Sequence, residues 1–385
     1  MADNNENKVL NVPHLRFPEF TEEWEETTLG KISEITKGSG ISKDQLSEQG
    51  SPCILYGELY TKYKSEIIDE VYSRTELDSS SLVKSKANDV IIPCSGETAI
   101  DISTARCVPF NNILLGGDLN IIRLKHDDGG FFAYQLNGAR KKDIARVAQG
   151  VSVVHLYGEN LKHIRVYHPA IEEQKKITRL LSLIDERIAT QNKIIEDLKL
   201  LKSAIRKKVF VSLKEEHTES CEINQLLTYE QPTAYIVTND EYSTDTTLIP
   251  VLTANKGFVL GYTDEDFSIY QKGECIIFDD FTMDAKYVSF PFKVKSSAIK
   301  ILTAKPNVNL RFMFEYLSYL ELKSEEHKRH YISEIASLVV ELPSKEMQNK
   351  IASLMTSLDN KLALEENTKV KYEDEKQYQL SQMFI

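Results

Sequence analysis

The amino-acid sequence predicts an α+β fold built twice, with a mixed α/β globule followed by a long helix in each half. Two observations support this prediction. The first concerns residues 170–213, which contain neither proline nor glycine. Within them, six apolar residues and one glutamine are spaced alternately four and three residues apart: Ile177, Leu181, Ile184, Ile188, Gln191, Ile195 and Leu198. This 3.5-residue alternation is typical of a coiled-coil seam, and such a helix needs a partner to be stable.

The second observation is a copy of this stretch nearer the C-terminus, which begins at Pro343 and repeats the first stretch from Pro169 at a constant offset. The offset aligns Gln174 with Gln348 and Asp185 with Asp359. The seam recurs as Ile351, Met355, Leu358 and Leu362. We therefore expect the partner of the first helix to lie in the same chain.

The two globules share an order of segments. In each half, apolar runs bounded by turn residues predict strands, and a stretch with helical spacing follows them. The first half has strands within 51–63, 88–97 and 105–125 and a helix at 131–149, and the second has strands within 249–263, 273–282 and 290–305 and a helix at 311–331.

These correspondences set the expected domain boundaries. We expect a flexible leader at 1–11, a first globule at 12–168, a first long helix at 169–213, a second globule at 214–342 and a second long helix at 343–385. The start of the first globule is rich in apolar side chains and contains Trp24, the only tryptophan. We expect this start to lie as an apolar staple across a domain surface.

Length and composition narrow the class of protein. A chain of 385 residues is long enough for two domains with their own cores. No apolar run approaches the roughly 18 residues that cross a bilayer, and the polar start lacks a signal-peptide core, so we expect a cytoplasmic protein with no membrane span. The five cysteines form no CxxC pair, so we expect reduced, partly buried thiols at Cys53, Cys94, Cys107, Cys221 and Cys275.

The charge balance and the motifs bear on function. A formal charge of −11 argues against a general nucleic-acid coat but allows local basic patches. The sequence contains no P-loop, no GxSxG, no HExxH, no glycine fingerprint for a nucleotide cofactor and no Pro-Pro pair, which excludes the Pro-Pro signature of amino-methyltransferases. We therefore expect no catalytic residue, no metal site and no cofactor in this chain.

Two polar clusters admit more than one interpretation. Asp279, Asp280 and the run Asp284-Ala285-Lys286 resemble the acids of a metal nuclease, but their spacing is tight and the first half has no equivalent. They are otherwise a polar loop after a strand, or carboxylates that accept hydrogen bonds from cytosine amino groups. The run 327–330, His-Lys-Arg-His, lacks a third metal ligand, so it is a solvated helix end or a phosphate contact.

Basic residues recur at matching places in both halves. A single charge run is usually a solvated face, but the repetition favours two DNA-facing surfaces, positioned by phosphate contacts and reading base edges through loops. The basic candidates are Lys84, Lys86, Arg106, Arg140, Lys141, Lys142 and Arg146 in the first half, and Lys286, Lys293, Lys295, Lys300, Lys323, Lys328 and Arg329 in the second. The candidate base readers are Ser95, Glu97, Thr98, Asp101 and Thr104, then Asp279, Asp280, Thr282 and Asp284, with Tyr56, Tyr60, Tyr63 and Tyr287 as stacking or sugar contacts.

These segments together resemble the specificity subunit of type I restriction–modification systems. The stretch from Val12 to Gly30 resembles that family's N-terminal signature. The run 169–177 with the following LLSLIDERI resembles its central conserved helix, and 343–362 resembles the distal one. Segments 95–105 and 278–302 resemble two recurrent types of target-recognition domain.

The resemblance implies a particular architecture. Two target-recognition domains would each read one half of a bipartite DNA site, and the helices would pack as an antiparallel coiled coil with pseudo-two-fold symmetry. At 1.5 Å per residue, roughly 30–40 helical residues span ~45–60 Å, enough to hold two readers about one duplex turn, ~34 Å, apart. The implied helix–helix interface consists of Ile177, Leu181, Ile184, Ile188, Ile195, Leu198, Ile351, Met355, Leu358 and Leu362.

The resemblance also implies partners. The family's subunit binds double-stranded DNA and has no catalysis of its own. It docks two adenine-N6 methyltransferase subunits, which bind S-adenosylmethionine, and then restriction subunits, which are motor–nucleases that use ATP and Mg²⁺, in the cytoplasm of a bacterium or archaeon. The two halves are not strictly equivalent at one place. The first half has Gln-Gly-Val-Ser at 149–152 before the last strand of its globule, whereas the run 323–330 in the second half has no comparable glycine.

Two other functions remain open from the sequence. A coiled-coil adaptor with no DNA specificity, whose globules bind peptide or RNA, explains the acidity and the helices but not the paired α/β halves with basic loops. A metal nuclease would need Asp284 for activity with Mg²⁺.

Overall fold

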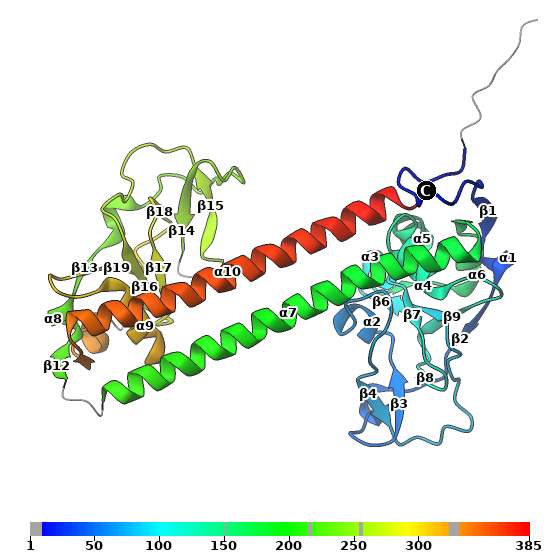
Figure 1. Cartoon of the computed structure of the whole chain (residues 1–385), viewed down its shortest axis with the longest axis horizontal. Coiled ribbons are helices and arrows are strands. Elements are labelled where there is room, and N and C mark those ends of the chain that lie inside the picture. The colour runs from blue at the N-terminus through cyan, green and yellow to red at the C-terminus, as the bar shows by residue number, and fades with distance from the viewer. Residues whose placement is uncertain (1–9, 151, 215–217, 254–256, 323–330) are drawn as a thin grey trace, which may run out of the picture. The chain divides into compact units, whose positions relative to one another are not determined.

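The structure is a computed structural model, and it describes residues 10–150, 152–214, 218–253, 257–322 and 331–385 (Figure 1). The chain forms two compact units. The first contains residues 1–192 and 367–385, and the second contains residues 193–366. Each long helix therefore contributes one part to each unit.

The first unit contains a four-stranded antiparallel sheet in the order β2-β9-β5-β7. Its strands are β2 (Ser33–Lys37), β5 (Asp89–Pro93), β7 (Arg106–Val108) and β9 (Leu119–Leu124). A three-stranded sheet has the order β4-β3-β8, with β3 (Ser51–Ile54), β4 (Ser73–Thr75) and β8 (Leu114–Leu115). Two strand pairs join β1 (Glu25–Thr28) to β11 (Arg165–His168) and β6 (Ser95–Gly96) to β10 (Val154–His155).

Short helices surround these sheets. They are α1 (Leu29–Ile32), the 3₁₀ turn η1 (Lys43–Gln45), α2 (Glu58–Thr61), α3 (Ala99–Ile102), α4 (Gly129–Asn137), α5 (Lys141–Val147) and α6 (Gly158–Lys162). Helix α4 packs against β5 and β7. Its N-cap is Asp128, whose carboxylate accepts a hydrogen bond from the Phe131 amide at 2.8 Å, because the first amides of a helix have no partner within it.

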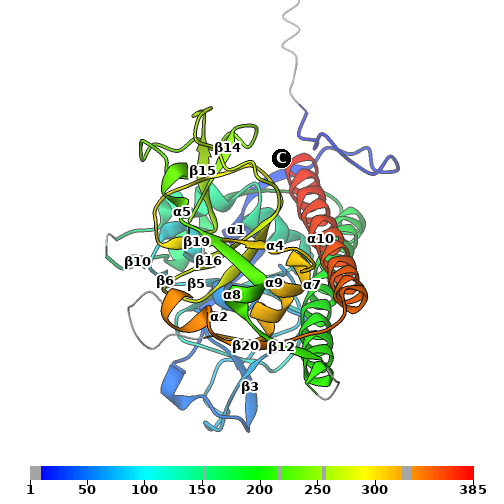
Figure 2. The same ribbon diagram turned by 90° about the vertical axis from the view of Figure 1, so that its left-hand side faces the viewer.

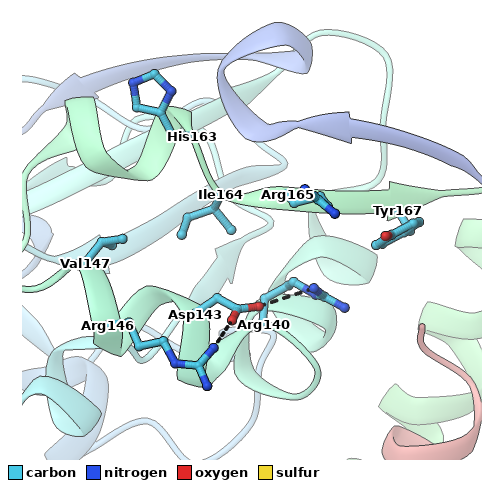
Figure 3. A pocket seen from close by; sticks show the side chains of 8 residues that line it. All are labelled: Arg140, Asp143, Arg146, Val147, His163, Ile164, Arg165 and Tyr167. Atoms are coloured by element: carbon cyan, nitrogen blue, oxygen red, sulfur yellow. Dashed lines mark hydrogen bonds and ion pairs between the residues drawn. The ribbon is translucent and has the colours of Figure 1, made fainter.

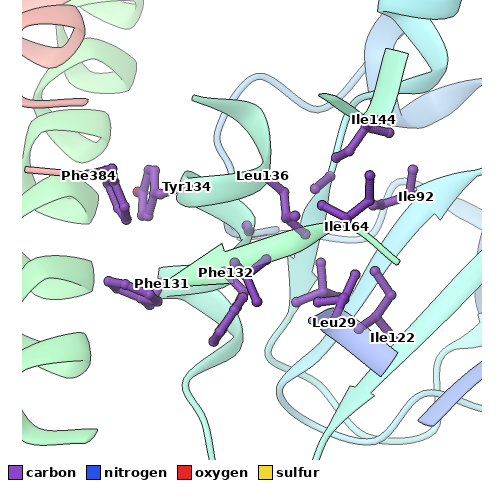
Figure 4. Close-up of a cluster of buried hydrophobic side chains, with 14 of the residues drawn as sticks. Leu29, Ile92, Ile122, Phe131, Phe132, Tyr134, Leu136, Ile144, Ile164 and Phe384 are labelled. Carbon is purple, nitrogen blue, oxygen red and sulfur yellow. The ribbon is translucent and has the colours of Figure 1, made fainter. Parts of the chain in front are cut away.

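Both faces of strand β5 are buried, which explains its uninterrupted apolar sequence. Val90 and Ile92 join one apolar cluster, whereas Ile91 joins another, because successive side chains of a strand point to opposite faces. Figure 4 shows the first cluster, where Phe131 of α4 meets Phe384 from the end of the chain with ring centroids 5.2 Å apart. The last residues of α10 and the segment after it therefore belong to the core of the first unit.

The second unit repeats this plan. Its four-stranded antiparallel sheet has the order β13-β19-β16-β17, with β13 (Leu227–Glu230), β16 (Cys275–Asp279), β17 (Ala285–Val288) and β19 (Ile299–Ala304). Its three-stranded sheet has the order β15-β14-β18, with β14 (Ile249–Leu252), β15 (Val259–Thr263) and β18 (Lys293–Val294), and β12 (Glu219–Glu222) pairs with β20 (Val339–Leu342). The helices are α8 (Ile223–Leu226), the 3₁₀ turn η2 (Pro232–Tyr235), α9 (Leu310–Tyr319) and the π-helical turn η3 (Tyr331–Ile335).

The matching strand orders confirm the prediction of a duplicated α+β fold. In the second unit α9 packs on the four-stranded sheet (Figure 2), as α4 does in the first. The central strand again sends alternate side chains to two clusters, with Ile276 and Phe278 in one and Ile277 in the other. Among the described residues, the β6–β10 pair occurs in the first unit alone.

The two long helices, α7 (Ile171–Leu213) and α10 (Lys345–Gln382), start in the same way. The Gln174 amide nitrogen donates to the Pro169 carbonyl oxygen at 2.9 Å, and its amide oxygen accepts from the Asp128 backbone amide at 2.9 Å. Gln348 donates to the Pro343 carbonyl oxygen at 2.9 Å and accepts from the backbone amide of the α9 N-cap, residue 309, at 2.8 Å. The offset between the two stretches of sequence therefore corresponds to repeated hydrogen bonds.

The residues of the predicted seam are buried or half-buried within each unit, and the first ones of each helix join the core of a globule. Ile177 and Leu181 are buried in the first unit, and Ile351 and Met355 are buried in the second. The other predicted seam residues are buried or half-buried: Ile184, Ile188, Gln191, Ile195, Leu198, Leu358 and Leu362. In the second unit the ion pairs Lys199–Glu366, at 2.9 Å, and Lys202–Asp359, at 2.5 Å, run in opposite directions along the two helices, so the helices are antiparallel there.

A buried ion cluster joins the helices to the first globule. Lys376 of α10 lies 2.5 Å from Glu66 and 2.7 Å from Asp185 of α7. The Tyr134 hydroxyl of α4 donates to Asp185 at 2.7 Å. Charged groups are stable in a protein interior when they are paired and hydrogen-bonded, so these contacts tie three elements together.

The second unit has its own cluster around Glu315 of α9, which is fully buried. Arg206 of α7 lies 2.8 Å from this carboxylate, and Arg311 lies 2.5 Å from it. Arg311 also pairs with Asp359, the residue that corresponds to Asp185 under the sequence offset. Both helices and the globule are again joined by ion pairs.

The N-terminal segment forms the predicted staple. Trp24 is 2% exposed and packs edge-on against Phe131, with ring centroids 5.5 Å apart. The Arg16 guanidinium forms a bidentate pair with Glu173 of α7, with both N–O distances 2.7 Å. The cysteines are unpaired thiols, buried except for the half-buried Cys221. No helix within the described residues is long and apolar enough to span a membrane.

Candidate nucleic-acid interface

The structure brings several candidate readers of the first half to one surface around α3, which contacts α5, β6 and β10. Burial raises the pKa of Tyr60, and Tyr56, Asp101 and Glu97 raise it further. Burial lowers the pKa of Lys141 on α5, while Asp101 raises it. We call this set, Tyr60, Glu97, Thr98, Asp101 and Lys141, the α3 surface.

Local hydrogen bonds hold the α3 surface in shape. Thr98 is the N-cap of α3: its hydroxyl oxygen accepts from the Asp101 amide at 3.1 Å, and the hydroxyl donates to the Asp101 carboxylate at 2.6 Å. Gly96 has to be glycine, because a Cβ there would lie 2.5 Å from the Ile102 side chain. Thr98, Glu97 and the neighbouring Lys142 are exposed.

The run that begins Gln149-Gly150 belongs to a turn beside this surface. Gly150 has φ +121°, and a Cβ there would lie 2.1 Å from the Val153 carbonyl oxygen. The turn lets Gln149 and His155 exchange two backbone hydrogen bonds, at 2.9 and 2.7 Å. Strand β10 follows and pairs with Ser95 and Gly96 of β6. Residue 151 lies outside the described residues.

Some first-half candidates occupy other places. Arg106 is 7% exposed and donates to the main-chain oxygens of Leu59 and Tyr63, at 3.1 and 2.9 Å. Thr104 and Tyr63 are buried as well. These three side chains therefore serve the internal framework, which corrects their placement on a DNA-facing surface. Lys84 and Lys86 are exposed on the segment before β5.

The acidic cluster of the second half is a structured turn after β16. Asp279 is buried, and its carboxylate accepts from the Phe281 amide at 2.8 Å and from the Thr282 hydroxyl at 2.7 Å. Asp280 is also buried, 3.2 Å from Lys300, and it accepts from the Tyr331 amide at 2.8 Å. Both carboxylates are thus engaged by donors of their own chain, which favours the polar-loop interpretation and corrects their assignment as base readers.

The same turn leaves other candidates at the surface. Thr282, Asp284 and Lys286 are exposed, and Lys286 pairs with Asp284 at 2.9 Å. Lys295 is exposed, with its ammonium 5.9 Å from the Tyr242 ring centroid. Within the described residues, no group of three or more His, Cys, Asp and Glu side chains is placed to hold a metal ion.

Lys293 illustrates why a basic residue in the sequence need not face DNA. Its side chain is 0% exposed, lies 2.5 Å from Glu265 and donates to the Phe267 carbonyl oxygen at 2.9 Å. Burial alone would raise the pKa of Glu265, but hydrogen bonds from Lys293 and Thr238 hold it at about 2. Lys293 is therefore part of the internal framework. The remaining candidates, Lys323, His327, Lys328, Arg329 and His330, lie outside the described residues.

A basic pocket of about 410 Å³ lies between α5, α6 and β11 of the first unit (Figure 3). We call it the arginine pocket and define it by Arg140, Asp143, Arg146, His163, Arg165 and Tyr167. The sequence prediction named Arg140 and Arg146 but missed His163 and Arg165. The sequence offers one indication for Arg165: it lies two residues before Tyr167 on a strand, so the two side chains share a face. Only the fold, however, places that strand beside α5.

A second pocket, of about 300 Å³, lies in the second unit between the end of α7 and the end of α9. Its basic side chains are Arg206, Lys207 and Lys214. Arg206 is already paired with the buried Glu315, so this pocket has less free positive charge than its composition indicates.

Comparisons with known proteins place the chain among DNA-specificity proteins. Residues 21–200 and 215–373 match the family model for the type I restriction modification DNA specificity domain. The chain is 39% identical over 142 residues to the Escherichia coli type I restriction enzyme EcoR124I/EcoR124II specificity subunit, a match that covers 35% of each protein. It is 25% identical over 276 residues to a putative type I restriction enzyme MjaX specificity subunit of Methanocaldococcus jannaschii, over 64% of this chain and 65% of that one.

The matched regions thus span about a third and just under two thirds of the lengths of these relatives. Among solved structures, the S subunit of a type I restriction-modification system from M. genitalium superimposes with a TM-score of 0.68 and 16% identity, over 97% of this chain and 99% of that one. A chain from a structural study of complex assembly and conformational transition in the type I R-M system gives a TM-score of 0.57 and 13% identity, over 94% and 97%. At these identities the structural matches establish the fold.

Proposed function

Because the chain belongs to the type I restriction modification DNA specificity family, we propose that it is the DNA-recognition subunit of a type I restriction–modification complex. Each globule reads one half of a bipartite site in double-stranded DNA. The two long helices join the readers into one frame, which sets the gap between the half-sites. Partner subunits methylate adenine N6 or cleave the DNA, in the cytoplasm of a bacterium or archaeon.

The observation that supports this proposal is the duplication with unlike surfaces. The two units share their strand order and the hydrogen bonds of Gln174 and Gln348. They differ where side chains are exposed: the first presents the α3 surface, and the second presents the turn after β16. A frame repeated twice with two different surfaces suits a protein that reads two different short sequences along one duplex.

The chemistry of the complex belongs, in this proposal, to other subunits. The α3 surface combines carboxylates, a hydroxyl, an ammonium and a phenol, which are groups that hydrogen-bond to base edges and phosphates. We propose that this chain acts without catalysis, docked to two methyltransferase subunits that bind S-adenosylmethionine. Restriction subunits that use ATP and Mg²⁺ complete the complex.

Long-read sequencing that detects modified bases tests the proposal, with host DNA from cells that carry the gene and from cells that lack it. We expect one N6-methyladenine motif, made of two short halves and a fixed gap, to disappear with the gene. If every methylated motif persists, the proposal fails. Recovery of a stable complex without a methyltransferase would then support a coiled-coil adaptor.

An exchange of domains tests the division of labour. Replacing residues 12–168 with the corresponding globule of a relative of different specificity should change one half of the methylated motif and leave the other half and the gap unchanged. The matched control replaces residues 214–342, which should change the other half. A motif that is unaffected by either exchange contradicts the assignment of one half-site to each globule.

A further inference from the structure

The arginine pocket of the first unit has an excess of positive charge. Three guanidinium groups and the Asp143 carboxylate line it, and Glu26 at its edge pairs with Arg165, which leaves a formal charge of +1 when His163 is neutral (3 − 2 = 1). Asp143 is shared, because Arg140 and Arg146 both pair with it, at 3.2 and 3.0 Å. This local excess stands out in a chain whose formal charge is −11. Anions respond to such local charge rather than to the net charge.

The pocket also has hydrogen-bond donors to offer. The side chains of Arg146 and Arg165 are 76% and 65% exposed, and Arg165 has one ion pair, with Glu26 at 3.1 Å. Arg140 is mostly buried, and within the described residues its Nε finds no hydrogen-bond acceptor. A buried donor is normally satisfied. A ligand with several acceptor oxygens would use the two exposed guanidinium forks, beside the positive charge of Arg140.

Arg140 is held in place by contacts on its other sides. Its guanidinium carbon lies 5.4 Å from the Tyr167 ring centroid, and its Nη2 donates to the main-chain oxygen of Ile385. Figure 3 shows Arg140 and Arg146 on either side of Asp143, with Arg165 and Tyr167 on the neighbouring strand. The wall of the pocket is therefore built before a ligand arrives, which lowers the entropic cost of binding.

The pocket lies next to the candidate reading surface. Helix α5 contacts both α3 and α6. Its Lys141 is near Asp101 on the α3 side, whereas Arg140 and Arg146 line the pocket. A helix with its side chains is about 10–12 Å across, and the major groove of B-DNA is about 12 Å wide. If the major groove of a bound duplex faces the α3 surface, one of the two sugar–phosphate backbones would therefore lie on the other side of α5, where the arginine pocket is.

We propose that the arginine pocket binds a backbone phosphate of the DNA that the first globule reads. This inference rests on the proposed function and assigns a specific contact within it. Arg146 and Arg165 form charge-assisted hydrogen bonds to the phosphate oxygens, and the guanidinium of Arg140 adds positive charge beside them. The contact sets the register of the globule on the duplex and carries no base information.

Salt-dependent DNA binding tests this assignment. The full-length chain, purified with its methyltransferase partner, is titrated against a labelled duplex that carries the methylated motif and against a scrambled duplex, between about 50 and 200 mM salt. The test variant is Arg146→Ala with Arg165→Ala. Arg179→Ala with Arg187→Ala is the matched control, because it removes two exposed arginines of α7, and the Arg179 side chain has the same 65% exposure as Arg165.

The expected result is a uniform loss. Affinity for both duplexes should fall by a similar factor, so that the preference for the motif is kept. The slope of log K against log salt should become shallower by about 0.9, the amount for one phosphate. The ratio of wild-type affinity to variant affinity should therefore fall about 3.5-fold between about 50 and 200 mM salt. Arg146→Lys with Arg165→Lys should keep the slope but bind less tightly, because lysine keeps the charge and lacks the fork.

Other outcomes overturn the assignment and can be told apart. A changed motif preference with an unchanged slope would make the pocket a base reader. Unchanged DNA binding together with loss of the methyltransferase from the purified complex would assign the pocket to an acidic segment of that partner. A wild-type complex that binds the motif and scrambled duplexes equally would refute the proposed function itself, independently of the variants.

Discussion

Replacing Lys376 with methionine tests whether the buried ion cluster holds the first unit together. Lys376 lies 2.5 Å from Glu66 and 2.7 Å from Asp185, and all three side chains are buried. Methionine keeps much of the length of the side chain but removes its charge, so two carboxylates remain buried without their cation. Removing one partner of a buried ion pair costs ~3–5 kcal/mol of unfolding free energy.

The fluorescence of Trp24 provides the assay, because this residue is the only tryptophan and packs in the core of the first unit. With a urea dependence of about 2 kcal/mol per molar, a loss of about 4 kcal/mol shifts the midpoint of unfolding by about 2 M. The control is Lys371→Met, which changes an exposed lysine of the same helix. A surface substitution of this kind stays within about 0.5 kcal/mol.

The pH dependence gives a second test of the same cluster. Burial alone would lower the pKa of Lys376, but Glu66 and Asp185 raise it above its ordinary value. A raised pKa contributes stability that is complete below the unfolded value of about 10.4 and is lost as the pH rises through the folded value. Wild-type protein should therefore lose stability above about pH 10 by a step that Lys376→Met lacks. Equal midpoints at pH 7, or equal alkaline losses, would refute the reasoning.

Three further predictions use the same unfolding measurements. Gln174→Ala should cost the first unit about 1–3 kcal/mol, because it leaves main-chain groups at a helix start unpaired. The equivalent Gln348→Ala should leave the tryptophan transition unchanged and lower the transition of the second unit, followed by circular dichroism. Glu265→Gln should destabilise at pH 7 but much less near pH 2. Burial alone would raise the pKa of the Glu265 carboxyl, but its lysine partner holds this pKa at about 2. The carboxylate therefore contributes its full stability above the unfolded pKa of about 4.3, and this contribution is lost as the pH falls towards the folded pKa. An equal loss of unfolding free energy at both pH values would contradict this. Leu181→Glu with Met355→Glu places one carboxylate in the core of each unit. This double variant should lower the unfolding transitions of both units and abolish assembly with partner subunits. Retained assembly and normal melting would contradict the role of the seam.

The repeated frame could be predicted from the sequence because its causes are local or periodic. The seam residues follow a 3.5-residue alternation, and the central strand of each half is an apolar run. Both patterns can be recognised without knowing which segments pack against them. The equivalence of Gln174 and Gln348 came from a fixed offset between two similar stretches. Each of these signals lies within a short window of sequence.

The division of charged residues between surface and interior could not be predicted in this way. Arg106 is buried because main-chain oxygens of a distant helix accept its hydrogen bonds, and Lys293 is buried because Glu265, on an earlier segment of the chain, neutralises it. A basic residue next to a strand looks the same in the sequence whether such a partner exists or not. The arginine pocket was hidden for the same reason, because it needs α5 and β11 side by side.

The contrast between frame and surface bears on the proposed function, in which the two globules read different half-sites. Asp185 and Asp359 correspond under the offset that aligns Pro169 with Pro343, and so do their partners, Lys376 of α10 and Lys202 of α7, so the two ion pairs that join the helices are copies of one another. The same pairing, between an aspartate of one long helix and a lysine of the other, is therefore repeated in both units. Several side chains near the α3 surface and in the turn after β16 lie outside this frame and are exposed, among them Glu97, Thr98, Thr282 and Asp284. Under the proposed function, substitutions of these exposed side chains should alter what a globule contacts and leave the ion pairs between the helices in place.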